Sequence, residues 1–580
     1  MSKHSVSQFL ANQPQQRYAR RAHCLLVIIA LVGLIVLLRT LQLQVLDNDY
    51  YVKEGNERYL RTVEVAAHRG VIADRNGEPL AISTPVESAW VNPQVMLKAD
   101  ISPGKIQQLA RLLEITPVQM LEQIKTNANK EFVYLKRQLN PKTVLEISQL
   151  KVPGIYFKRE YRRYYPSAEV FAHVIGFTNI DDKGVEGLEL ALNKTLTGKN
   201  GKQRVVKDNL GQAVEQIESI QAPQPGEDLV LSLDRHIQYL AYKELKTAVS
   251  AHGAQSGSAV VMDVLTGEVL AMVNQPAFNP NEKAKLPVKY YRNRAVTDLF
   301  EPGSVVKPFI VATALQNGRY SRETIIDTTP GYIQVGAKRI YDLHNYGKID
   351  LSLLLQKSSN VGATKLALEI PPQQYWQLLS ALGLGQSTHS GFPGEATGRL
   401  RHFSQWSQID RATLAYGYGL SVTVLQLAQA YGVLANGGIF VPATFTKINQ
   451  PAPKQRVMLP VIARQVNNML ETVVHPGGTG ILAEVAGYRI AGKTGTVHKM
   501  TAQGYADDQY LSVFAGFAPA SKPRLAVVVT IDNPSKGGYL GGTVAAPVFS
   551  NIMAGALRQL NIAPDALQNQ PLKLAGQAQP

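Results

Sequence analysis

The sequence predicts an α+β protein with one membrane-spanning helix, an elongated spacer domain and a C-terminal domain. The C-terminal domain is expected to hold a five-stranded antiparallel sheet with helices on its faces. An uncharged apolar run lies near the N-terminus, strand-like runs lie at both ends of the C-terminal half, and helical patterns lie between them. At 580 residues the chain is too long for one ordinary domain.

Composition narrows the class of protein. A hydrophobic content of 45% and a charged content of 18% are typical of a globular protein. The net charge of +16 suits nucleic acid, anionic lipid, an acidic polymer or an ordinary solvated surface. No finger, RNP-like or basic-helix motif supports nucleic acid, so we expect no such partner, and we expect no cofactor or metal. The single cysteine, Cys24, lies in the apolar run and excludes an intramolecular disulfide.

Residues 22–38, "AHCLLVIIALVGLIVLL", carry no charge and would span roughly 26 Å as a helix. Basic residues and no acid precede them, so the positive-inside rule places residues 1–21 in the cytoplasm and the rest outside. No small-x-small cleavage site follows, although a cleaved signal peptide is the alternative. We therefore predict an uncleaved membrane anchor over residues 22–42.

Residues 43–225 are predicted to form a pedestal without catalytic chemistry. "VIADRNGEPLAIS" is typical of a hairpin with its turn at Asn76 and Gly77. "ISPGKIQQLARLLEIT" and "LNPKTVLEISQLKVPG" indicate short amphipathic helices. "GVEGLELALNKTLTGKNG" indicates one further helix ended by glycines. We therefore predict a spacer or docking role for this region.

Residues 226–563 are predicted to form the catalytic domain, after the linker "IQAPQPGED". "GSAVVMDVLTGEVLAMVNQP" predicts a hairpin turning at Thr266 and Gly267, and "YRIAGKTGTV", "YLSVFAGFAPA" and "RLAVVVTIDNP" predict three further strands. "TVLQLAQAYGVLANGG" predicts a helix capped by Thr423 and ended by Gly437, and "APVFSNIMAGALRQL" predicts another. The polar, Gln-rich residues 564–580 are predicted to be a disordered tail.

The stretch "GYRIAGKTGT" fits two patterns. It matches the phosphate loop G-x-x-x-x-G-K-[ST], and Lys493 to Gly495 match the K-T-G element of penicillin-recognising serine enzymes. The apolar run "LAVVVTID" ends in an aspartate, and such a strand would suit a nucleotide site. A phosphate loop must open a helix, however, and the Thr- and Gly-rich residues after Lys493 favour a strand. An extracytoplasmic domain also lacks free ATP, so we favour K-T-G.

Two further short motifs carry candidate chemistry. "EPGSVVKPF" contains Ser304 and Lys307, which share one face of a helix at a spacing of three. Pro308 is tolerated only near a helix start, so the helix should begin close to Ser304 and offer the hydroxyl free N–H groups. "QKSSNVG" supplies Ser358 and Asn360 as an S-x-N element. Each motif alone is weak, because such residues are commonly caps or surface groups, but the ordered set S-x-x-K, S-x-N and K-T-G is specific.

With these motifs the chain resembles a class B penicillin-binding protein over nearly its whole length beyond the membrane. "RGVIADRNG", "RRYYP" leading to "AHVIGFTN", and "GVEGLE" are similar to non-catalytic motifs of that class. Asn360 and Thr494 resemble the division-specific branch of the class, in contrast to the elongation-specific branch. Ala168 and Val424 depart from the pattern, which has glycine and proline there. The resemblance implies a serine β-lactamase-like transpeptidase fold and a dimerisation-type pedestal.

The resemblance also implies a role for each motif residue. Ser304 would attack the carbonyl between two D-alanines at the end of a peptidoglycan stem peptide. Lys307 would be its base, since burial and the nearby cation Lys493 would lower a pKa that is ordinarily near ~10.4. Ser358 would relay a proton to the leaving D-alanine, and Asn360 would hold Lys307 and the substrate amide.

The remaining expected roles concern binding. The backbone N–H groups of Ser304 and Thr496 would form the oxyanion hole. Thr494 and Thr496, with the fixed positive charge of Lys493, would bind the terminal carboxylate, and Gly495 would let the substrate backbone approach the strand. An amine from a neighbouring stem would then take the acyl group, and β-lactams would stall the enzyme as acyl adducts.

The resemblance implies a single-pass protein of the inner membrane at the division septum, with a periplasmic catalytic domain. Implied partners are an FtsW-like membrane glycan polymerase and other divisome proteins. The motifs do not specify the acyl acceptor, so a D,D-carboxypeptidase and an elongation-type transpeptidase stay as alternatives. A β-lactamase, a penicillin sensor and a bifunctional synthase are disfavoured, because their additional motifs or domains are not found in the sequence.

Overall fold

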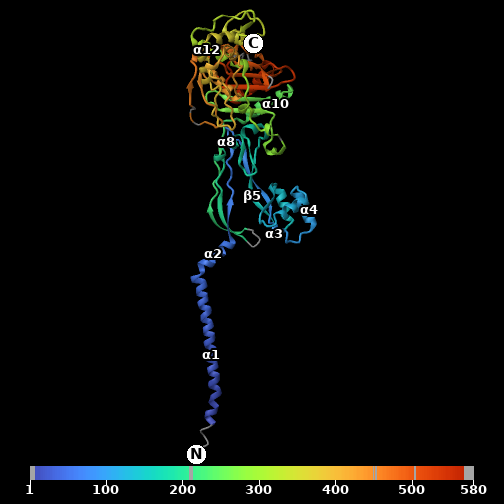
Figure 1. Ribbon diagram of the computed structural model, residues 1–580, viewed down its shortest axis with the longest axis vertical. Coiled ribbons are helices and arrows are strands. Elements are labelled where there is room, and N and C mark those ends of the chain that lie inside the picture. The colour runs from blue at the N-terminus through green and yellow to red at the C-terminus, as the bar shows by residue number, and fades with distance from the viewer. Residues whose placement is uncertain are drawn as a thin grey trace, which may run out of the picture.

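The computed structural model describes residues 7–207, 213–285, 287–448, 450, 453–501 and 504–566. The chain is elongated, with the N-terminal helix at one end of its long axis and the C-terminal domain at the other (Figure 1). Helix α1 (Ser7–Leu41) continues through a π-helical turn (Gln42–Leu46) to α2 (Asn48–Tyr59). Within the described ranges, one helix is long and apolar enough to cross a membrane, and Cys24 is exposed on it.

Two larger sheets form most of the pedestal in the part of the chain that the structure describes. The first is antiparallel in the order β1-β8-β9 and consists of β1 (Leu60–Val65), β8 (Gly201–Lys207) and β9 (Ala213–Gln221). The second has the order β10-β2-β3-β4, with β5 also paired to β3; it contains β2 (Ile72–Ala73), β3 (Pro79–Val91), β4 (Val133–Leu139), β5 (Ile155–Tyr164) and β10 (Leu229–Val230). The predicted hairpin is confirmed, since Gly77 turns the chain at a φ of 89°.

Short helices pack on the outer part of the second sheet around a small apolar core. They are α3 (Pro93–Met96), α4 (Pro103–Leu112), α5 (Pro117–Thr126) and α6 (Pro141–Gln149). The predicted helices at α4 and α6 are confirmed. α7 (Ala172–Ile175) and the two-stranded sheet of β6 (Phe177–Thr178) and β7 (Gly184–Glu186) lead to the junction with the C-terminal domain.

The single helix predicted for "GVEGLELALNKTLTGKNG" is wrong. Its first residues form β7, and the rest form α8 (Gly187–Ala191) and α9 (Asn193–Leu196), interrupted at Leu192. The Asn193 side chain accepts hydrogen bonds from the Gly184 N–H and from Arg69, both at 2.9 Å. Such side-chain bonds to nearby groups compete with helix continuation.

A buried cluster of charges holds these pedestal motifs together. The carboxylate of Glu189 accepts from Nε of Arg69 at 2.8 Å and from Nε of Arg163 at 2.7 Å. Arg69 also donates to the carbonyl of Asp182, and Arg163 donates to Oγ of Ser83, both at 3.1 Å. The cluster therefore joins "RGVIADRNG", "RRYYP" and "GVEGLE", three segments that are distant in sequence.

The C-terminal domain contains the predicted five-stranded antiparallel sheet, in the order β12-β11-β21-β20-β19. Its strands are β11 (Ser256–Asp263), β12 (Val269–Gln275), β19 (Ala491–Thr501), β20 (Gly504–Ala518) and β21 (Leu525–Asp532). The middle strands are apolar on both faces because helices cover both sides. β19, which contains K-T-G, is an edge strand.

The two faces of the sheet have separate apolar cores. α10 (Arg235–Ala251) and α19 (Gly541–Gln559) cover one face, and α17 (Val424–Ala435) lies on the other. The predicted α17 cap is confirmed, because Thr423 accepts from the Gln426 N–H at 3.1 Å. The remaining helices of this domain include α11 (Arg294–Thr297), α12 (Lys307–Asn317), α13 (Leu351–Lys357), α14 (Asn360–Glu369), α15 (Pro372–Ala381), α16 (Gln408–Leu414) and α18 (Pro460–Glu471).

Small strand pairs interrupt the part of this domain that was expected to be mostly helical. They are β13 (Ile326–Asp327) with β16 (Lys348–Ile349), β14 (Tyr332–Val335) with β15 (Lys338–Tyr341), and β17 (Ile439–Phe440) with β18 (Gln455–Arg456). At the C-terminus, Asp565 accepts from the backbone N–H of Arg489 at 2.7 Å. Most of the predicted disordered tail, residues 567–580, lies outside the described residues.

Two positions depart from the expected sequence pattern, and one of them has a visible consequence for the backbone. Ala168, where glycine was expected, has a φ of 43°, in the left-handed region that favours glycine. Val424, where proline was expected, is the first residue of α17, a position that tolerates proline. The first substitution therefore strains the backbone, and the second leaves the helix start intact.

Candidate active site

Ser304 lies in a tight turn at the start of a buried helix. A 3-10 turn (Gly303–Val306) precedes α12, and Pro308 is in the first turn of that helix, as predicted. Ser304 is half-buried, whereas Lys307 is 0% exposed. In a 3-10 turn, side chains three residues apart lie on one side, so both residues face the same space.

The amine of Lys307 is held by the S-x-N element. It donates to the carbonyl oxygen of Ser358 at 2.5 Å and to Oδ1 of Asn360 at 2.7 Å, and it lies 3.1 Å from Oγ of Ser358. A neutral amine has two hydrogens and one lone pair. The two carbonyl oxygens can only accept hydrogen bonds, so each of them receives one of the two N–H groups. The lone pair then stays free to accept a proton.

Lys493 approaches the same hydroxyl from β19. Its amine donates to Oγ of Ser358 at 3.0 Å and to the carbonyl of Thr494 at 3.2 Å. The Ser358 hydroxyl therefore lies between two fully buried amines. Ser358 itself has φ 60° and ψ 41°, a left-handed conformation that is costly for a serine and is typical of functional sites.

Burial sets the proton affinity of both amines. It lowers the pKa of Lys493 to about 7. Burial, together with the charge of Lys493, lowers the pKa of Lys307 well below its ordinary value, against an opposing effect of Asp342. Lys493 was expected to be a fixed positive charge, and its burial acts against that charge.

The K-T-G element lies on a strand and not in a phosphate loop, so the nucleotide-binding alternative is wrong for Lys493. Thr494 and Thr479 share a hydrogen bond at 2.7 Å between their hydroxyls, and Oγ1 of Thr496 accepts from the Gly541 N–H at 3.0 Å. Thr479 was missed from the sequence, where it is one of many threonines beside glycines.

Gly495 lies against the turn that carries Ser304. A Cβ at this position would lie 3.1 Å from the carbonyl oxygen of Pro302 and 3.1 Å from Cγ1 of Val305. Gly495 therefore lets the turn that carries Ser304 pack against β19. Glycine here lets the nucleophile turn and the K-T-G strand pack closely, and the approach of a substrate backbone at this residue stays a prediction.

The sequence-predicted residues thus come together from three elements, although not by every contact expected. Lys307, Ser358, Asn360 and Lys493 form one hydrogen-bonded group, and Thr494, Gly495 and Thr496 follow on β19. Among the side chains that the structure describes, no hydrogen bond joins Ser304 to Lys307. The i, i+3 spacing therefore places these two residues on one side of the turn without bonding them.

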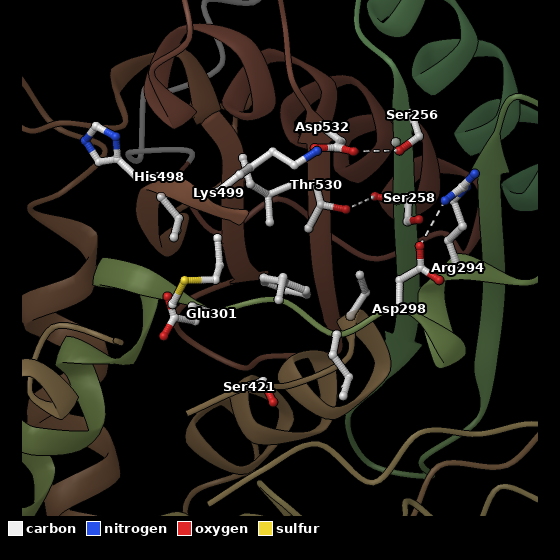
Figure 2. Close-up of a pocket in the computed structure, with 17 residues that line it drawn as sticks. Ser256, Ser258, Arg294, Asp298, Glu301, Ser421, His498, Lys499, Thr530 and Asp532 are labelled. Carbon is white, nitrogen blue, oxygen red and sulfur yellow. Dashed lines mark hydrogen bonds and ion pairs between the residues drawn. The ribbon is translucent and has the colours of Figure 1, made fainter. Parts of the chain in front are cut away.

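A cavity of about 450 Å³ lies behind the Ser304 turn and contains none of these lysines. It is bounded by Phe300 and Glu301 ahead of the nucleophile and by strand residues after K-T-G (Figure 2). Arg294 pairs with Asp298 at 2.9 Å in its wall, and Lys499 pairs with Asp532 at 2.7 Å. These charges are mutually compensated, so we place the chemistry at the lysine pair.

Comparison with known proteins identifies the family. Residues 257–554 match the penicillin binding protein transpeptidase domain, and residues 64–231 match the penicillin-binding protein dimerisation domain. The chain belongs to the class B penicillin-binding proteins. It is 46% identical to the peptidoglycan D,D-transpeptidase FtsI of Escherichia coli, over 96% of this chain and 94% of that protein. It is 41% identical to the probable peptidoglycan D,D-transpeptidase PenA of Neisseria gonorrhoeae, over 94% and 93%.

Solved structures agree with this membership. The transpeptidase domain of penicillin-binding protein 3 from Burkholderia pseudomallei covers 58% of this chain, and 97% of that chain is matched, at 44% identity and a TM-score of 0.54. Penicillin-binding protein 3 of Mycobacterium tuberculosis, in a complex with aztreonam, covers 87% of this chain, with 98% of that chain matched, at 29% identity and a TM-score of 0.67. The predicted combination of transpeptidase and pedestal domains is confirmed.

Proposed function

We propose that the protein is a peptidoglycan D,D-transpeptidase that cross-links stem peptides ending in D-Ala-D-Ala during septal wall synthesis. The observation that carries this proposal is the Ser358 hydroxyl, which lies between the buried amines of Lys307 and Lys493 beside the Ser304 turn. The names of the relatives support transpeptidation, and the comparisons do not favour the carboxypeptidase or elongation-type alternatives.

In the acylation step, Oγ of Ser304 bonds to the carbonyl carbon of the penultimate D-alanine, and its proton passes to the neutral amine of Lys307. The backbone N–H groups of Ser304 and Thr496 hold the oxygen that becomes negative. The C–N bond to the terminal D-alanine then breaks. Its nitrogen takes the proton of the Ser358 hydroxyl, which is replaced by a proton from the protonated Lys307.

In the second step, an amine from a neighbouring stem attacks the acyl carbon. Lys307, neutral again, takes a proton from that amine by way of Ser358. The bond to Ser304 then breaks, and Lys307 passes this proton to Oγ of Ser304. Earlier, before acylation, Thr494, Thr496 and the protonated form of Lys493 bind the terminal carboxylate of the donor, which then leaves with the terminal D-alanine. A β-lactam enters by the same first step and stays on Ser304, because its leaving nitrogen remains tethered.

We place the enzyme in the inner membrane at the septum, with α1 as a single-pass anchor, a cytoplasmic N-terminus and a periplasmic catalytic domain. Its expected partners are an FtsW-like glycan polymerase and other divisome proteins. The apolar helix α1 and the pedestal motifs support this placement.

The test is labelling of the purified full-length protein with a fluorescent penicillin, followed by identification of the modified residue by mass. Wild type should carry one adduct on Ser304, and a Ser304→Ala variant should carry none. Equal labelling of both proteins, or no labelling of wild type, would contradict the proposal.

A further inference from the structure

Asp342 is a half-buried carboxylate immediately after β15, outside the three catalytic motifs. It accepts three hydrogen bonds at the start of α14: from Oγ of Ser359 at 2.6 Å, from the N–H of Asn360 at 2.5 Å and from the N–H of Val361 at 2.9 Å. Its own N–H donates to the carbonyl of Gly331 at 2.9 Å. One side chain thus binds two consecutive N–H groups of the catalytic element.

These contacts hold α14 by its positive end. The first N–H groups of a helix have no partner within it, and a negative charge there is stabilising. At the other end of α14, Arg411 donates to the carbonyls of Ala367, Leu368 and Ile370, at 3.0, 2.7 and 3.0 Å. Charges of the favourable sign, supplied by other parts of the chain, therefore fix both ends of this helix.

The same short segment also orients the amide of Asn360. Nδ2 of Asn360 donates to the carbonyl of Tyr341 at 3.0 Å, which turns Oδ1 toward the amine of Lys307. Residues 341 and 342 therefore fix both the backbone and the side chain of the asparagine. Since the Ser358 carbonyl and hydroxyl directly precede this helix start, their positions relative to Lys307 depend on it too.

Asp342 also contributes charge. The groups that face Lys307 are Lys493 from β19 and Asp342 from the loop after β15, and Tyr346 lies near the same carboxylate. Burial and Lys493 lower the pKa of Lys307, whereas Asp342 raises it. Lys307 thus has a carboxylate nearby that is bonded to the element holding its amine and not to the amine itself.

We propose that Asp342 is a positioning residue for acylation: it fixes the Ser358–Asn360 element against the two lysines and supplies the negative charge that moderates their mutual repulsion. This inference rests on the proposed function, because it concerns the acylation of Ser304. Asp342 would act through the Ser358–Asn360 element and not on the reacting atoms.

The test compares Asp342→Asn and Asp342→Ser with wild type. Both replacements cap helices well and remove the charge, so at least one should fold. The measurement is the second-order rate constant for labelling of Ser304 by a fluorescent penicillin, across about pH 5 to 9. We expect a rate lower by about 10- to 100-fold, as small misplacements of reacting groups produce. We also expect the acidic limb of the profile to move to lower pH, because protonated Lys307 loses its compensating charge.

Two matched control variants separate the effect of the Asp342 charge from the effect of its hydrogen bonds to α14. Ser359→Ala removes one contact of Asp342 and keeps its charge, and Arg411→Met loosens the far end of α14. Both should lower the rate less than the loss of Asp342 and leave the acidic limb in place. A folded Asp342 variant with a rate within about two-fold of wild type would overturn the inference, and so would a rate loss with an unmoved limb. Absence of Ser304 labelling in wild type would instead overturn the proposed function.

Discussion

The pedestal and the active site each bury two basic side chains, but their surroundings differ. In the pedestal, Arg69 and Arg163 bracket the carboxylate of Glu189, and all three side chains are at most 5% exposed. In the active site, Lys307 and Lys493 share the neutral hydroxyl of Ser358, and neither makes an ion pair among the contacts of the described chain. Guanidinium groups cannot lose their proton, whereas amines can.

The presence of a carboxylate partner in one cluster and not in the other indicates the role of each. A buried ion pair that is fully bonded fixes three segments in one arrangement, and it is costly to break. A buried amine without a carboxylate partner gives up its proton and becomes a base, at a cost to folding. The pedestal cluster therefore stabilises the fold, whereas the lysine pair supplies a base for the reaction.

The largest expected effect is in the pedestal. Glu189→Gln leaves two buried guanidinium groups without a carboxylate, and we expect it to lower the free energy of unfolding by about 3–5 kcal/mol. Thermal unfolding of the full chain in detergent measures this. Glu218→Gln, at the exposed pair with Arg204, is the control and should cost less than about 1 kcal/mol. Equal losses from both variants would mean that the cluster is not a structural centre.

Replacing an active-site amine should have the opposite sign. Lys493→Met removes a buried amine whose pKa is lowered to about 7, and we expect it to stabilise the protein by about 1–2 kcal/mol while abolishing acylation. Since the native state resists protonation of this amine, the gain should be full below about pH 7 and should shrink as the pH rises toward ~10.4. A destabilised Lys493→Met protein at pH 6 would break the comparison.

The third prediction concerns the pH dependence of acylation. The active form of the lysine pair carries one proton, on Lys493, and leaves Lys307 neutral as the base. Rates should fall at acidic pH as Lys307 becomes protonated, and at alkaline pH as Lys493, with a pKa of about 7, loses its charge. Labelling rates measured across the range test this. Lys493→Arg, which stays charged, should lose the alkaline limb; a limb that persists in that variant would assign it to another group.

The smallest expected effect concerns strain, which both regions also contain. Ala168 in the pedestal and Ser358 in the active site both adopt positive φ. Ala168→Gly relieves the strain without removing a functional group and should stabilise the fold by about 0.5–1 kcal/mol. A rise in the midpoint of thermal unfolding, with unchanged labelling of Ser304, is the expected result. A lower midpoint would show that the alanine methyl contributes packing that outweighs the strain.

The sequence predicted those parts of the molecule that depend on local pattern. Alternating and buried apolar runs indicated all five strands of the central sheet, and spacing in S-x-x-K placed Ser304 and Lys307 at a helix start. The family motifs of the pedestal were visible in the sequence, but their common purpose was not. The pairing of Arg69 with Glu189 joins positions far apart in the chain, and no single-sequence pattern specifies such a contact.

The properties that the sequence did not predict arise from burial and tertiary contact. The burial that lowers the pKa of Lys493 was not predicted, because the sequence context of this residue contains no measure of desolvation. The packing of Gly495 against the turn of Ser304 joins positions far apart in the chain, so no local pattern indicated it. Asp342 carried no signal, because a lone aspartate after a short strand is indistinguishable from a surface residue. The single helix predicted after Gly184 is wrong because its first residues pair as β7 with β6 and the rest is interrupted at Leu192.

The position of Cys24 has a practical consequence for experiments on this protein. It is the only thiol in the chain, and it lies on α1, in the segment predicted to be embedded in lipid. Water-soluble maleimides should therefore find no site on the native protein in membranes. A cysteine introduced into the pedestal or beside β19 would then be the single target for a spin label, a fluorophore or a cross-linker, without prior removal of a native thiol.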